Sequence, residues 1–270
     1  FSDCDTRFDS GCEVRTDTSP GHCGTCGNAC GVGDTCGRIA AGMCDESGVT
    51  QLVATDLHTL LLRDTGGLLG WGDGSLGQLG VGGTFVAEPA LIGTFVHVST
   101  ANGHSCGVRP DRRLMCWGNN GSSRLGDGTN TARAAPVPIA IDEVDDVATS
   151  AENTCVIRGG EVYCWGQRNQ GALGDGSLTG GNRLEPGPPI GGVDDAMAIT
   201  AGRNHFCMLR PISGGGTRVQ CWGRNAAGEL GRGSTTSGIA NASPADVISL
   251  PSDVVALSEG IGDHSCAAHA

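Results

Sequence analysis

Four windows of thirteen residues align without a gap, and this repetition constrains the fold more than any other feature of the sequence. Each window carries Trp-Gly and then, starting seven residues after that Gly, Leu-Gly-x-Gly. The repeated tryptophans are Trp71, Trp117, Trp165 and Trp222, which lie 46, 48 and 57 residues apart. Periods of this length are typical of the blades of a β-propeller, so the repeats predict a propeller.

A second motif precedes each window, in which His or Asn stands two residues before Cys or Leu. Its copies begin at His58, His104, Asn153, His205 and His264. No Trp-Gly follows the last copy, so the chain holds four full repeats and the opening of a fifth. Because a His recurs once per repeat, we expect each to stabilise a turn or strand by hydrogen bonding. Equivalent positions of neighbouring blades are too far apart to share one metal ion.

The segments between these motifs alternate apolar and polar residues in short runs that end at Gly, Asp or Pro, which is typical of antiparallel strands. Gly accounts for 47 of the 270 residues, which suits tight turns better than helices. The predicted fold class is therefore all-β, a propeller over residues 49–270. The expected repeats are 49–92, 93–139, 140–190 and 191–248, with a partial repeat at 249–270 and a Cys-rich, disulfide-stabilised module at 1–48.

The cysteines predict how two strands of each repeat pair. In CVIRGGEVYC, Gly159 and Gly160 suit a two-residue hairpin turn, which needs positive φ angles. Counting outward from this turn places Cys155 directly opposite Cys164, where a disulfide can form. The same counting predicts the disulfides Cys106–Cys116, Cys155–Cys164 and Cys207–Cys221. In the first repeat Leu60 and Gly70 occupy these positions, so packing replaces the covalent bond there.

These disulfides indicate the compartment, because such bonds persist only where the environment is oxidising. We therefore expect a secreted or cell-surface protein, the alternative being reduced cysteines buried as small apolar groups. Cys266 opens the fifth copy of the motif. Its partner is expected beyond Ala270 in a longer natural protein or, as the alternative, in the N-terminal segment.

The N-terminal segment contains half of the 14 cysteines and few apolar residues. Seven is an odd number, so at least one partner lies elsewhere, and the pairing within residues 1–44 stays open. A Cys-x2-Cys-x3-Cys spacing could hold a metal, but the other cysteines favour disulfides here too. These residues are Cys4, Cys12, Cys23, Cys26, Cys30, Cys36 and Cys44.

Charge and motif content argue against several functions. The formal net charge of −12 disfavours nucleic acid, whose affinity for proteins rests on Lys and Arg. No apolar run is long enough to insert into a membrane as a helix. Gly-Asp-Gly at Gly126 and Gly174 offers one carboxylate where calcium needs six or more oxygens. We found no phosphate-binding loop, nucleophile elbow or zinc motif, and expect no catalytic residues, metal or cofactor.

The pattern W-G-x-N-x-x-G-x-L-G-x-G resembles the repeat of the regulator of chromosome condensation family over residues 49–270. Asn120 and Asn225 lie near the family's Asn, whereas Asp73 and Gln167 begin the same turn differently. The resemblance implies a propeller, seven-bladed in most members. The family's nucleotide-exchange activity beside chromatin conflicts with the disulfides and the negative charge. The N-terminal cysteine pattern resembles short modules that precede repeat domains in secreted proteins of myxobacteria.

We therefore expect an extracellular recognition or adhesion module that binds a protein or glycan and has no catalytic activity. The candidate binding loops follow each Leu-Gly-x-Gly and differ among the repeats, while the framework does not. They span residues 84–88, 129–135, 178–185 and 234–242. The alternatives are a structural subunit of an extracellular fibre, stalk or surface layer, built from copies of the chain, and an enzyme with a site in the propeller channel.

Overall fold

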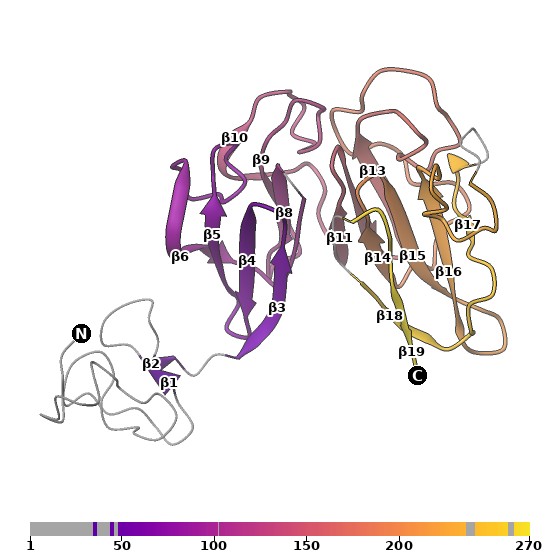
Figure 1. The fold of residues 1–270 in the computed structure, drawn as a ribbon. Helices are drawn as coiled ribbons and strands as arrows, with labels where there is room; N and C mark the ends of the chain where they lie inside the picture. Colours follow the sequence, from indigo (N-terminus) through magenta and orange to yellow (C-terminus); the bar gives the residue numbers. More distant parts are fainter. Residues whose placement is uncertain (1–34, 37–43, 46–47, 102, 236–240, 259–261) are drawn as a thin grey trace, which may run out of the picture. The chain divides into compact units, whose positions relative to one another are not determined.

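The structure is a computed structural model that describes residues 35–36, 44–45, 48–101, 103–235, 241–258 and 262–270 (Figure 1). The chain forms two compact units, Phe1–Val49 with Arg63–Thr65, and Thr50–Leu62 with Gly66–Ala270. In the first unit, β1 (Thr35–Cys36) pairs antiparallel with β2 (Cys44–Asp45). The predicted disulfides of the Cys-rich module lie outside the described residues.

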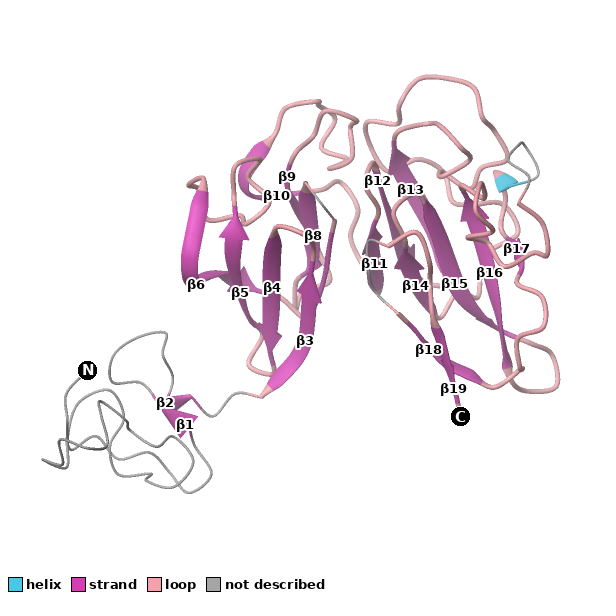
Figure 2. Cartoon of the chain, viewed as in Figure 1, coloured by secondary structure: helices cyan, strands magenta, loops and turns pink. Residues whose placement is uncertain are grey.

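The second unit consists of antiparallel sheets whose strands follow one another in chain order, with loops between them (Figure 2). Blade 1 contains β3 (Val49–Ala54), β4 (His58–Arg63), β5 (Gly67–Asp73) and β6 (Phe85–Thr94). Blade 2 contains β7 (His97–Thr100), β8 (His104–Val108), β9 (Leu114–Gly118) and β10 (Arg133–Pro138). The all-β prediction is confirmed.

The later blades repeat this order. Blade 3 contains β11 (Asp146–Thr149), β12 (Asn153–Arg158) and β13 (Glu161–Gly166), and a bridge from Gly166 to Arg183 stands where a fourth strand would pair. Blade 4 contains β14 (Ala198–Ala201), β15 (His205–Pro211), β16 (Thr217–Gly223) and β17 (Ala245–Asp246). The described part of blade 5 is the pair β18 (Val254–Leu257) and β19 (Ala267–His269).

The second and third strands of blades 1 to 4 pair in the register that the sequence predicts. Cys155 lies opposite Cys164, and both turn glycines between them, Gly159 and Gly160, have positive φ. Leu60 faces Gly70 in blade 1. The structure contains the three expected disulfides, Cys106–Cys116, Cys155–Cys164 and Cys207–Cys221. All six half-cystines are almost fully buried.

Two of the expected loops are wrong in part, because strands begin inside them. Residues 85–88 belong to β6, where Phe85 pairs with Asp73, and residues 133–135 belong to β10, where Arg133 pairs with Gly118. These fourth strands are mostly exposed outer edges that contain Pro, so their sequences lack the apolar alternation of an inner strand. Part of the fourth expected loop, residues 236–240, lies outside the described residues.

The apolar cores of blades 1 to 3 are each completed by the tryptophan of the next blade. Trp117 packs with Leu60 and Leu79 of blade 1. Trp165 packs with Leu125 and the Cys106–Cys116 disulfide of blade 2, and Trp222 packs with Leu173 and the corresponding disulfide of blade 3. The three indoles are fully buried. The blades therefore share their cores with their neighbours instead of each enclosing its own.

Candidate binding surface

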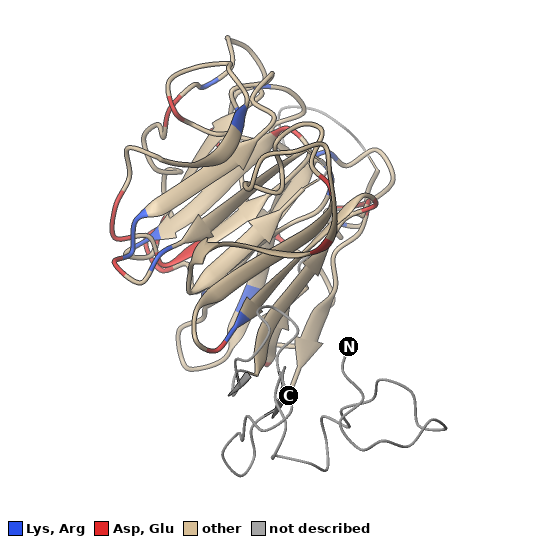
Figure 3. Cartoon of the chain, turned by 90° about the vertical axis from the view of Figure 1, so that its left-hand side faces the viewer, with Lys and Arg blue, Asp and Glu red and all other residues tan. Residues whose placement is uncertain are grey.

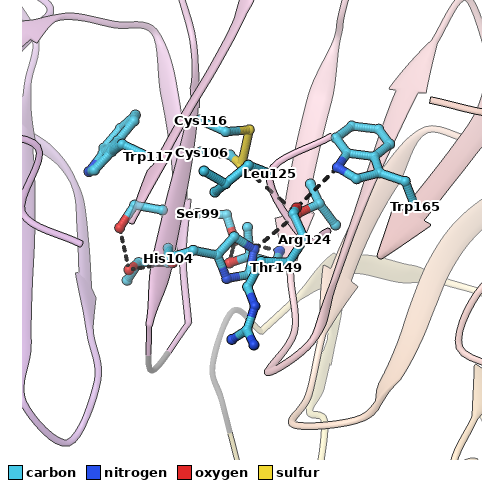
Figure 4. Close-up of a disulfide and its surroundings, with 12 residues drawn as sticks. Ser99, His104, Cys106, Cys116, Trp117, Arg124, Leu125, Thr149 and Trp165 are labelled. Carbon is cyan, nitrogen blue, oxygen red and sulfur yellow. Dashed lines mark hydrogen bonds between the residues drawn. A yellow bond between two sulfur atoms is a disulfide. The ribbon is translucent and has the colours of Figure 1, made fainter. Parts of the chain in front are cut away.

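A recurring hydrogen bond joins each of blades 1 to 3 to the next blade at the residue before Leu-Gly-x-Gly. The backbone carbonyl of Arg124 accepts a hydrogen bond of 3.0 Å from Nε1 of Trp165 (Figure 4). Trp117 donates in the same way to Gln78, and Trp222 to Ala172, at 2.8 and 3.1 Å. A Cβ on Gly126 would lie 2.4 Å from the indole nitrogen of Trp165, which explains the glycine in this motif.

The recurring histidines reach across the same joints. Nε2 of His104 lies 2.9 Å from the hydroxyl of Thr154, which in turn donates to the Arg124 carbonyl at 2.7 Å. His58 contacts Thr100 of blade 2, and His205 contacts Ser265 of blade 5, at 2.7 and 2.8 Å. Asn153 instead donates to backbone carbonyls of its own blade, and His264 is exposed.

Burial keeps these joint histidines neutral. It lowers the pKa of His58 to about 4, against a smaller opposing effect of Asp73. It also holds the pKa of His104 well below its usual value, and the positive charge of Arg124 adds to the effect. The pKa of His205 is lowered by burial too. A neutral imidazole bound to a hydroxyl acts here as a structural group that connects two blades.

We expect acid to destabilise the propeller between pH 6.5 and about 4. The unfolded chain takes up a proton at His58 near pH 6.5, whereas the folded chain stays neutral there until about pH 4, so unfolding binds a proton in this window. The loss reaches roughly 3 kcal/mol for His58. Urea unfolding across this range should show a shallower pH dependence in the variant His58→Asn. An unchanged slope in that variant would contradict the assignment.

The loops that join the first to the second strand and the third to the fourth strand meet at one end of the blades. Backbone bonds of 2.7 to 3.1 Å connect them, as from Asn119 to Gly103 and from Gln167 to Glu152. We call this the loop end and define it by the third-to-fourth-strand loops. These span residues 74–84, 119–132, 167–182 and 224–244, of which residues 236–240 lie outside the described part of the chain. The hairpins between second and third strands lie at the opposite end, because successive strands run antiparallel.

Internal ion pairs hold the base of two of these loops. Asp127 accepts a hydrogen bond of 2.7 Å from Nε of Arg133. Burial raises the pKa of Asp127, but hydrogen bonds from Thr129 and Arg133 outweigh this and lower it. Asp175, at the same position of the next repeat, pairs with Arg183 at 2.9 Å. Figure 3 shows acidic and basic positions close together in the loops.

The loops combine a constant buried base with exposed tips that differ. Their Leu side chains, Leu79, Leu125, Leu173 and Leu230, are at most 1% exposed. The tips carry unrelated sequences, and the third contains an exposed stretch at residues 179–182. The loop end is therefore a variable surface on a rigid support.

The first strands of the blades line a small cavity of about 60 Å³. Its polar groups are the hydroxyls of Ser99, Thr100, Thr149 and Thr200, and two of them, Ser99 and Thr149, bond each other at 3.0 Å. The other lining residues are apolar, so the cavity offers no general acid or base. Within the described residues, no His, Cys, Asp or Glu cluster could hold a metal, and no helix is long and apolar enough to cross a membrane.

Antiparallel sheets of up to four strands that follow one another along the chain are typical of the blades of a β-propeller. A family model of the regulator of chromosome condensation (RCC1) repeat matches residues 49–78. Human WBSCR16 is similar in structure, with a TM-score of 0.71 and 23% identity over 92% of this chain and 65% of that one. Prp20p of Saccharomyces cerevisiae has a TM-score of 0.68 and 16% identity over 82% of this chain and 55% of its own. Its structure was reported with its binding to Gsp1p and histones.

Sequence relatives agree with this fold. The human probable E3 ubiquitin-protein ligase HERC3 is 28% identical over 71% of this chain, which spans 19% of HERC3. The chain covers 2% of a second ligase, human HERC2, at 29% identity, so it spans less than a fifth of these curated relatives. Residues 49–270 thus have the fold of a β-propeller, and residues 49–78 match the RCC1 repeat.

Proposed function

We propose that this protein is an extracellular recognition module that binds a partner protein through the loop end and has no catalytic activity of its own. The observation that carries the proposal is the contrast between the constant framework and the variable, exposed loop tips. Loops that differ in sequence on a constant framework suit binding. Catalysis would instead need titratable groups that converge at one site. Protein binding by Prp20p is in keeping with this, although a shared fold does not transfer a target.

The extracellular location is supported by the disulfides. Each of the three bonds joins buried cysteines on paired strands of a separate blade. A reducing compartment would keep these thiols reduced and remove the covalent links from the blades. The net charge of −12 gives no basis for contact with nucleic acid, so the partner we propose is a protein.

Site-specific photo-crosslinking tests the loop end as the binding surface. A photoreactive residue at Thr179 of the third loop should form adducts with proteins of the extracellular medium or cell surface. The matched control is the same residue at Asp111, which is also exposed but belongs to a hairpin at the opposite end. Equal labelling from both positions, or adducts at Asp111 alone, would contradict the proposal. If the protein bound glycans on an array and formed no protein adducts, the partner would be a glycan and the proposal of a protein partner would be wrong.

A further inference from the structure

The four loops of the loop end contain few charged residues, although the chain as a whole has a net charge of −12. The first loop, residues 74–84, contains none. The charged residues of the other three loops are Arg124, Asp127, Arg168, Asp175, Arg224, Glu229 and Arg232. The contacts of these residues determine what charge the loop end offers to a partner.

The charges of the second loop are neutralised inside the protein. Arg124, whose side chain is 9% exposed, lies between blades 2 and 3, and its Nη2 is 2.5 Å from Oε2 of Glu152. Asp127, whose side chain is 7% exposed, lies 2.7 Å from Nη2 of Arg133. Neither charge of this loop is therefore free to bind a partner.

The third and fourth loops follow the same rule. Nη1 of Arg168 lies 2.5 Å from Oδ2 of Asp175, and these side chains are 14% and 21% exposed. Nε of Arg224 lies 3.3 Å from Oε1 of Glu229. Arg232 donates hydrogen bonds to two backbone carbonyls of its own blade. Each charged residue of the described loops thus has a partner within the protein itself.

The exposed tips consist of uncharged groups that form hydrogen bonds. Hydroxyls and amides donate as well as accept, so the tips can bind either kind of group. Leu76 is the one large apolar side chain exposed in the described parts of these loops, and their sequences contain no aromatic residue. The exposed polar residues are Ser75, Thr84, Asn130, Thr131, Gln170, Thr179, Asn182, Ser234 and Thr235.

The opposite end of the blades is different. The hairpin of blade 2 has the sequence RPDRR at residues 109–113. The side chains of Asp111, Arg112 and Arg113 are 53%, 50% and 71% exposed. Charged side chains are therefore displayed at the hairpins, so the uncharged surface is a property of the loop end and not of the whole chain.

We propose that the loop end binds a protein surface that is itself uncharged, through hydroxyl, amide and backbone groups; this inference rests on the proposed function. A charged group of a partner would lose water on binding and find no free opposite charge in the loops, which costs free energy. Ser, Thr, Asn and Gly instead provide adaptable hydrogen bonds, as they do in antibody loops. Without facing charges, the affinity is independent of salt.

A salt series on the full-length protein tests this independence without any change to the surface charge. The photoreactive residue is placed at Thr179, and the yield of protein adducts is measured by gel electrophoresis. We expect yields that agree within about twofold between about 0.05 and about 0.5 M NaCl, because no exposed charge pair is screened. A loss of adducts by about fivefold or more at the higher concentration would overturn the proposal.

Charges of both signs at Gln170 give a sharper test. This exposed residue lies in the same loop as Thr179. A charged partner surface would favour one of Gln170→Glu and Gln170→Lys and disfavour the other. An uncharged surface disfavours both, so each should lower the adduct yield by at least about fivefold, whereas Gln170→Asn should not. Opposite responses to the two signs, or no response to either, would overturn the proposal.

The matched controls are Ser213→Glu and Ser213→Lys, which place the same charges at an exposed position of the blade 4 hairpin and should leave the yield unchanged. Equal urea midpoints would show that all variants are folded. Adducts that form at Thr179 but depend on salt or on the sign of the charge would overturn this inference alone. The absence of adducts from Thr179 under every condition would instead overturn the proposed function of the loop end, and this inference with it.

Discussion

Reduction of the three propeller disulfides is expected to lower the free energy of unfolding by up to about 8 kcal/mol. The bonded cysteines are 9 to 14 residues apart, and closing a loop of this size stabilises a protein by roughly 2.5–3 kcal/mol on the chain-entropy model. A single domain has only about 5–15 kcal/mol in total. Urea unfolding with and without dithiothreitol, followed by tryptophan fluorescence, measures the difference.

The double variant Cys155→Ala/Cys164→Ala removes one disulfide and leaves the other two in place. It should lose roughly 2–3 kcal/mol and retain a cooperative transition. Blade 1 is the natural comparison, because Leu60 and Gly70 pair there without a covalent bond. A reduced protein that unfolds at the same urea concentration as the oxidised one would contradict the expected stabilisation by the disulfides.

The hairpin register could be predicted because the information for it is local. The turn at Gly159 and Gly160 determines which residues face each other over the next few positions, and the opposed cysteines provide an independent check on the count. The same reasoning succeeded around the three-residue and five-residue turns of blades 2 and 4. The tryptophan spacing then indicated how often this unit recurs.

The hydrogen bonds between blades could not be predicted because they join residues far apart in the sequence. The carbonyl that accepts from Trp165 belongs to Arg124, 41 residues earlier, and the equivalent residues Gln78 and Ala172 share no side-chain property with it. The His104 ring bonds a hydroxyl 50 residues away. Such partners become visible only when neighbouring blades are stacked.

The ion pairs at the loop bases involve aspartates that the sequence suggests for a different chemistry. Asp127 and Asp175 stood out in the Gly-Asp-Gly motifs as fragments of calcium loops. In the structure each pairs with the arginine that directly follows its loop, Arg133 or Arg183. The outer strands were missed for another reason, since edge strands with exposed residues and Pro resemble loops in composition.

Trp165→Ala is expected to destabilise the propeller by about 3–5 kcal/mol, the usual cost of removing a large buried aromatic side chain. The indole is fully buried between blades 2 and 3, so its loss opens a cavity against Leu125 and the Cys106–Cys116 disulfide. The Arg124 carbonyl keeps the hydrogen bond from Thr154, so most of the loss comes from packing. Equilibrium urea unfolding followed by circular dichroism gives the free energy.

Two further variants divide this loss by cause. Trp165→Phe removes the Nε1–H donor but keeps an aromatic ring, and should cost roughly 1–2 kcal/mol. Trp71→Ala removes the same side chain from the equivalent position of blade 1, where it is only half-buried, so it should cost less than Trp165→Ala. Equal losses at Trp71 and Trp165 would mean that the tryptophans stabilise their own blades instead of joining neighbours.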